Sequence, residues 1–90
     1  MSQEEVYKQL VEATVQILRS IVEDTSIPRN IRRAASDAIS VLLSGKGSIE
    51  VRASNAISIL DEISNAPNMP IHARTKIWEC LSKLEQIKGV

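Results

Sequence analysis

Apolar residues recur every three to four positions in four segments of the chain, which is the spacing of one face of an α-helix. No segment alternates apolar and polar residues with the period of a strand. We expect apolar residues such as Val6 in the first segment and Ile71 in the fourth to face a common core. The pattern predicts an all-α protein with helices over residues 3–23, 28–44, 49–64 and 70–88.

The residues that bound these segments are typical of helix ends. Ser2 and Ser48 are placed to cap the first and third helices with their hydroxyl groups. Gly45 follows the second helix, where a glycine favours termination. Pro28 and Pro70 are each predicted to begin a helix, because a first-turn residue needs no N–H donor.

The two halves of the chain are similar at a shift of 42 positions, which aligns Pro28 with Pro70 and Arg32 with Arg74. A shorter similarity between the second and third segments has an offset of whole helical turns, so a shared apolar stripe explains it. We therefore prefer the longer unit, a helical hairpin used twice. Two such hairpins are expected to close on each other as a compact antiparallel four-helix bundle, a single domain over residues 1–90.

The stretch from Asp24 through Pro28 and Arg32 to Leu42 resembles the second half of a HEAT repeat. In that family the Asp and Arg help to join neighbouring repeats. The second half of the chain departs from the pattern, since Ala66 stands at the position that matches Asp24. Helical solenoids need about three units, and this chain has two, so the closed bundle remains the better interpretation.

Longer stretches resemble a small archaeal family of uncharacterised helical proteins of about this length. The matching residues are VEDTSIPRNIRRAA at 22–35, LDEISN at 60–65, PNMP at 67–70 and RTKIWE at 74–79. The resemblance implies a four-helix bundle and no established activity.

The composition argues against several classes of protein, including membrane-spanning, disulfide-linked and strongly basic nucleic-acid-binding proteins. Eleven Lys and Arg residues balance eleven Asp and Glu residues, so no net charge attracts nucleic acid or an anionic membrane. No apolar run approaches the ~18 residues of a membrane span. A single cysteine excludes an internal disulfide, and the acidic N-terminus is not a signal peptide. We expect a cytoplasmic protein without a membrane segment.

His72 and Cys80 are the side chains that most readily bind metals or act as nucleophiles. They lie eight residues apart on one predicted helix, roughly 12 Å along its axis. That separation is too long for one metal or for a nucleophile–base pair. We therefore expect a surface histidine, a buried or half-buried cysteine, no cofactor, no metal and no enzymatic activity.

Carboxylates gather at the ends of the first and third helices, at Asp24 and Asp61. Arg32 and Arg74 occupy matched positions early in the helices that follow. An arginine beside the core needs a partner, because an unpaired charge there is costly. We predict structural Arg–carboxylate pairs among these four residues. A hydrolytic or cation-binding acid site is the less favoured alternative.

Arg29, Arg32 and Arg33 form a basic patch after Pro28 that is a candidate for binding phosphate or an RNA backbone. No aromatic residues interleave with these arginines and no glycine-rich loop accompanies them. Binding of RNA or phosphate is therefore the alternative function, and a nucleic-acid partner is not the one we expect.

Three apolar residues outside the main stripes, Val41, Leu43 and Ile59, cannot all face one four-helix core. A contiguous exposed patch of such residues indicates a partner surface, most simply for twofold self-association. Trp78 is assigned to the core in preference to an interface. The preferred function is a non-catalytic interaction or assembly module, whose partner is another protein or a second copy of the chain.

Overall fold

Four α-helices make up the protein in the computed structural model, which describes residues 1–88. The helices are α1 (Gln3–Val22), α2 (Arg29–Leu43), α3 (Ile49–Ile63) and α4 (Ile71–Lys88). No strand occurs in this part of the chain. The all-α prediction is confirmed, and each observed helix end lies within one residue of its predicted position. Residues 89–90 of the predicted domain lie outside the described range.

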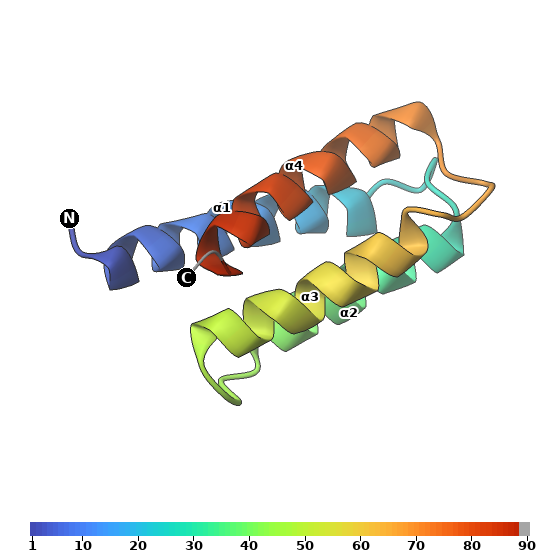
Figure 1. Cartoon of the computed structure of the whole chain (residues 1–90). Helices are drawn as coiled ribbons and strands as arrows, with labels where there is room; N and C mark the ends of the chain where they lie inside the picture. The colour runs from blue at the N-terminus through green and yellow to red at the C-terminus, as the bar shows by residue number, and fades with distance from the viewer. Residues whose placement is uncertain (89–90) are drawn as a thin grey trace.

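Each helix packs against the next along the chain, and α4 packs back against α1 (Figure 1). The predicted antiparallel four-helix bundle is thus confirmed, with principal extents of 38 × 22 × 20 Å. The α1–α2 and α3–α4 links meet at one end of the bundle. The opposite end holds the start of α1 and the α2–α3 turn, which diverge from each other in Figure 1. We call these the link end and the open end.

Serine caps and glycine turns form where the sequence predicts them. The hydroxyl oxygen of Ser2 accepts from the N–H of Glu5, and that of Ser48 accepts from the N–H of Val51, both at 3.2 Å. The turn after α2 has a positive φ at Gly45, 72°, where a side chain would be strained.

Pro28 and Pro70 were predicted to be the first residues of their helices. Each helix instead begins one residue later, so that each proline directly precedes its helix. Pro28 is the N-cap of α2, and its extended backbone (φ −56°, ψ 150°) directs the chain into the helix. Its carbonyl accepts from the N–H of Arg32 at 3.1 Å, and the carbonyl of Pro70 accepts from the N–H of Arg74 at 3.0 Å. Each proline therefore fixes where the second helix of a hairpin starts.

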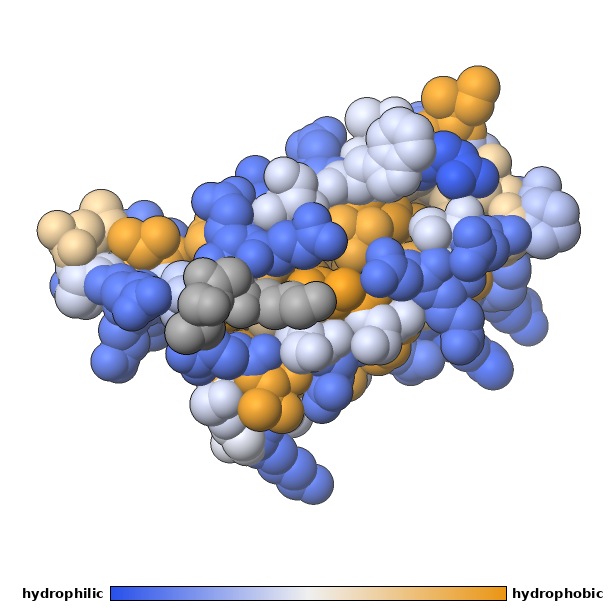
Figure 2. All heavy atoms as spheres, in the orientation of Figure 1, coloured by the Kyte–Doolittle hydropathy of each residue, from blue (hydrophilic) through white to orange (hydrophobic). Residues whose placement is uncertain are grey.

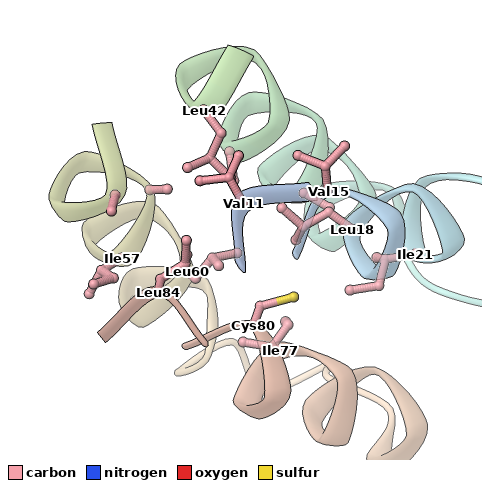
Figure 3. Close-up of a cluster of buried hydrophobic side chains, with 14 of the residues drawn as sticks. Val11, Val15, Leu18, Ile21, Leu42, Ile57, Leu60, Ile77, Cys80 and Leu84 are labelled. Atoms are coloured by element: carbon pink, nitrogen blue, oxygen red, sulfur yellow. The ribbon is translucent and has the colours of Figure 1, made fainter. Parts of the chain in front are cut away.

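The core is built almost entirely from aliphatic side chains that all four helices direct inward (Figure 3). Its largest fully buried members are Leu18, Ile21, Ile27, Ile31, Leu42, Leu60, Ile77, Leu84 and Ile87.

Three residues expected in this core lie outside it. Trp78 is 60% exposed, Ile71 is 84% exposed, and Val6 is also exposed. The placement of Trp78 and Ile71 was wrong because α4 buries the face that carries Ala73, Ile77 and Leu84. Ile71 and Trp78 are seven residues apart, so they share another line along the helix.

Candidate functional site

The link end brings together polar side chains from both hairpins. The Nε2 atom of His72, at the start of α4, lies 3.3 Å from Oδ2 of Asp24 in the α1–α2 link and 3.4 Å from Oγ of Ser26. Asn30 and Asn68 exchange amide hydrogen bonds of 3.2 and 3.0 Å beside them. These contacts join residues that are 38, 46 and 48 positions apart in the chain. They therefore tie the two hairpins together at this end.

Ser26, His72 and Asp24 have the residue types of a catalytic triad without its geometry. In a triad the serine and the carboxylate bind different nitrogens of the imidazole, so that a proton can pass between them. Here both approach the same Nε2 atom, and the Ser26 hydroxyl donates to Oδ1 of Asp24 at 2.6 Å. The cluster is also open to solvent, and its hydrogen bonds join the α1–α2 link to the start of α4.

The hydrogen bonds around Asp24 alter its acidity. Its pKa is lowered from the ordinary value, mainly because the hydroxyl and the backbone N–H of Ser26 both donate to the ionised carboxylate. His72 lowers the pKa further through its charge and its hydrogen bond. Asp24 is accordingly ionised at neutral pH.

The predicted Arg–carboxylate pairs are absent from the described residues, whose one ion pair joins His72 to Asp24. Arg32 instead donates from Nε to the carbonyl of Ile27 at 2.8 Å, and Arg74 donates from Nη1 to the carbonyl of Ser64 at 3.0 Å. Asp61 lies exposed at the surface.

The contact between Arg74 and the Ser64 carbonyl has a physical reason. Carbonyl groups at a helix C-terminus lack partners within the helix and carry partial negative charge. The last turn of α3 contains no basic residue, and Ser64 is its C-cap. The guanidinium of Arg74, reaching back from the next helix, supplies the missing cation.

Arg52 also donates to a carbonyl at the end of the preceding helix, and this contact was not predicted from the sequence. Its Nη1 atom donates to the carbonyl of Leu42 at 2.8 Å, at the end of α2, whose last turn also has no basic residue. Its Nε atom is buried without a hydrogen-bond acceptor in the described part of the chain. A sequence signal existed, because Arg32, Arg52 and Arg74 are each the fourth residue of their helix.

The basic patch proposed for anions is divided by these contacts. Arg29 and Arg33 are exposed on α2, one turn apart, whereas Arg32 is half-buried and bonded to the Ile27 carbonyl. Two of the three guanidinium groups, those of Arg29 and Arg33, are therefore exposed to solvent, and the third already donates to a backbone carbonyl.

Cys80 lies in the core, with its sulfur 3.9 Å from the carbonyl oxygen of Thr14 on α1 (Figure 3). Burial raises the pKa of the thiol to about 12, so it is protonated at physiological pH. His72 is at the surface, as predicted. The described residues contain no group of three or more His, Cys, Asp or Glu side chains arranged to hold a metal.

The three predicted interface residues are not brought into one patch. Leu43 is 55% exposed at the open end, and Val41 is half-buried. Ile59 packs partly against the core and lines a shallow hollow between α2 and α3, together with Arg33 and Asp37. Leu43 and Ile59 line different hollows, and Val41 lines neither of them.

Two of the exposed large apolar side chains lie on α4. Ile71 and Trp78 project from one line of the helix, and Figure 2 shows apolar atoms standing out where α4 begins. Thr75, one turn after Ile71 and also exposed, lies between them. We call these three residues the α4 face.

A second feature is a groove of about 730 Å³ at the open end, between the first half of α1 and the α2–α3 turn. Its apolar lining comes from Tyr7, Val11, Leu42, Leu43 and Ile49. Its charged lining comes from Glu4, Lys8, Glu12, Glu50 and Arg52. We call it the open-end groove.

These observations define a small four-helix bundle of two hairpins, in which a proline precedes the second helix of each hairpin and arginines donate to carbonyls at the C-termini of α2 and α3. None of its described helices is long and apolar enough to cross a membrane. The chain belongs to the uncharacterised protein family UPF0147, whose family model matches residues 1–87.

Relatives in this family come from archaea. A UPF0147 protein of Thermococcus kodakarensis is 56% identical over 81 residues, which are 89% of this chain and 98% of the relative. A UPF0147 protein of Pyrococcus horikoshii is 56% identical over 79 residues, 87% of this chain and 85% of the relative. The earlier resemblance to an archaeal family of unknown function is thus confirmed.

Two crystal structures have the same fold. One is from a UPF0147 protein of Thermoplasma acidophilum, with a TM-score of 0.86 and 32% identity over 92% of this chain and 98% of the other. The other is the unknown-function protein MMP1188, with a TM-score of 0.81 and 45% identity over 94% of this chain and 92% of the other.

Proposed function

We propose that this protein is a non-catalytic interaction module whose α4 face binds a second copy of the chain. The observation that carries the proposal is the exposure of Ile71 and Trp78, at 84% and 60%. Covering an aliphatic side chain and an indole ring is favourable, since burial of apolar area contributes about 25 cal/mol per Å². An indole also contributes a large rigid contact surface.

The spacing on the α4 face supports a twofold partner. In an antiparallel pairing of two α4 helices about an axis between Arg74 and Thr75, Ile71 of each copy would lie against Trp78 of the other. A twofold interface needs one patch that complements itself. A residue spacing of seven places both side chains on the same line of the helix, which meets that need.

Charge supports the same pairing. It would place Glu79, which is exposed, beside the N-terminus of α4 in the other copy. That N-terminus carries partial positive charge, and the first turn of α4 contains no acidic residue of its own. Glu79 of the second copy would supply the missing negative charge.

Two features support the non-catalytic part of the proposal. His72 meets Ser26 and Asp24 through one nitrogen, which leaves no path for proton relay. The Cys80 thiol is buried with its pKa raised to about 12, so no thiolate nucleophile forms near pH 7.

The alternative function, binding of RNA or phosphate by Arg29, Arg32 and Arg33, has weaker support. The Nε atom of Arg32 already donates a hydrogen bond to the Ile27 carbonyl. Two exposed arginines on a chain with no net charge provide little attraction for a polyanion.

Sedimentation equilibrium of the full chain tests the proposal. We expect the wild-type protein to dimerise, and the double variant Ile71→Ser/Trp78→Ser to be monomeric at the same concentration. The matched control is Leu43→Ser/Val51→Ser, which removes two exposed apolar side chains away from α4 and should still dimerise. A wild-type protein that is monomeric throughout, or a control that dissociates equally, contradicts the proposal.

A further inference from the structure

We propose that the open-end groove binds an amphipathic helix of a partner protein, with basic residues beside its apolar stripe. This is a second interaction surface, remote from the α4 face and independent of self-association. The partner is defined by its chemistry: apolar side chains at helical spacing for the floor, and Lys or Arg for the rim.

The floor of the groove is suited to apolar side chains. Tyr7 and Val11 on α1 and Leu42 on α2 line the groove and are almost fully buried, and Ile49 on α3 is half-buried. Leu43 stands exposed on the wall. A volume of about 730 Å³ lies within the usual range for binding clefts. Grooves of this kind take apolar anchors from successive turns of a helix.

The rim of the groove favours a basic partner. Its acidic members are Glu4 and Glu12 on α1 and Glu50 on α3, and no ion pair within the described residues engages them. Of its two cations, Arg52 already donates to the carbonyl at the end of α2. The hydrogen bond to a neutral carbonyl leaves Arg52 charged, so Lys8 and Arg52 offset two of the three carboxylates and one negative charge remains in excess. The excess negative charge complements lysine or arginine on the partner.

The same rim disfavours other occupants. If two grooves met about a twofold axis, Glu4 and Glu12 of one copy would approach the same carboxylates of the other, so the groove does not complement itself. A nucleic acid would bring phosphates to the same carboxylates. The acidic rim thus distinguishes a basic helix from both alternatives.

The test titrates a designed helical peptide into the isotope-labelled full chain and follows amide NMR signals. The probe peptide has about 18 residues, or five turns, with leucines on one stripe and lysines on both flanks. A matched peptide carries glutamate in place of every lysine. We expect the lysine peptide to shift the signals of Tyr7, Val11, Leu43 and Ile49, and the glutamate peptide to leave them unchanged.

Matched variants identify the rim. Glu12→Lys should weaken binding of the lysine peptide by about threefold to fivefold, in line with the strength of exposed charge pairs. The control Glu23→Lys makes the same charge change at the other end of α1, outside the groove, and should leave the affinity unchanged. Leu43→Ser should weaken binding by removing wall contacts.

Equal binding of both peptides overturns the proposal. An equal loss of affinity in Glu12→Lys and Glu23→Lys overturns it too, because that result would show a general electrostatic attraction that is not specific to the groove. Signal changes confined to the α4 face overturn it as well. The variant Ile71→Ser/Trp78→Ser should still bind the lysine peptide. If the wild type is monomeric yet binds that peptide in the groove, self-association fails and the groove proposal stands.

Discussion

The guanidinium of Arg74 reaches back across the α3–α4 link and donates from Nη1 to the carbonyl oxygen of Ser64 at 3.0 Å. Arg52 does the same for Leu42 at 2.8 Å, and both pairs are ten residues apart. In each case the first turn of one helix closes the C-terminus of the helix before it. The contact combines a charge-assisted hydrogen bond with neutralisation of the helix dipole.

Arg74→Met should lower the free energy of unfolding by about 1–2 kcal/mol, because it leaves the Ser64 carbonyl without its charged donor. Asp61→Asn should change it by less than about 0.5 kcal/mol, since Asp61 is exposed and makes no ion pair among the described residues. Urea unfolding of both variants measures the difference. If Asp61→Asn lowered the free energy of unfolding as much as Arg74→Met, the result would support a pair between Arg74 and Asp61 and contradict this account.

Ser26→Ala should raise the pKa of Asp24 more than His72→Ala does, because it removes the hydroxyl hydrogen bond that lowers this pKa most, although the backbone N–H of residue 26 remains as a donor. Carboxyl NMR titration of the two variants measures both shifts. In the wild type the pKa of Asp24 is lower in the folded state, so the carboxylate stabilises the fold at neutral pH. That stabilisation is lost as the pH falls through the folded pKa. A larger pKa rise in His72→Ala would show that charge outweighs the hydroxyl.

Cys80 should make stability fall in alkali. Its pKa rises from an ordinary 9.0 to about 12 on folding, so above pH 9 the unfolded chain loses a proton that the folded chain keeps. Between pH 9 and pH 10 the wild type should lose about 1 kcal/mol more than Cys80→Ala. Denaturant unfolding at the two pH values measures the change, and parallel pH dependence in both proteins would refute the burial of the thiol.

Trp78→Ala should cost the monomer less than about 1 kcal/mol, because most of the indole is already in water. Leu84→Ala, at a fully buried position on the same helix, should cost about 2–5 kcal/mol. Thermal unfolding at a concentration below that of dimerisation compares the two. Equal losses would place the indole in the core.

The helices were predictable because each buries a single stripe, and serine, proline and glycine mark their ends. Ser48 and Gly45 act locally, through bonds to neighbouring residues or through their own backbone, so sequence alone reveals them. The proline positions were predicted to within one residue for the same reason.

Side-chain orientations and contacts between helices were harder to predict, because they depend on how the helices rotate within the bundle. Periodicity grouped Trp78 with Ile77, although a rotation of about 100° per residue separates a core position from the surface. Charge pattern suggested carboxylates for Arg74, although a helix C-terminus offered a nearer acceptor. The His72–Asp24 contact joins the start of α4 to the α1–α2 link, and only the closed bundle brings these two segments together.

Trp78 is the sole tryptophan, so its fluorescence reports directly on the α4 face. The most direct measurement is its emission and its quenching by acrylamide across a dilution series of the full chain. If two copies meet through α4, concentrated protein will emit at shorter wavelength and resist quenching, and dilution will reverse both. Red-shifted, freely quenched emission at every concentration would mean that no second copy covers this helix.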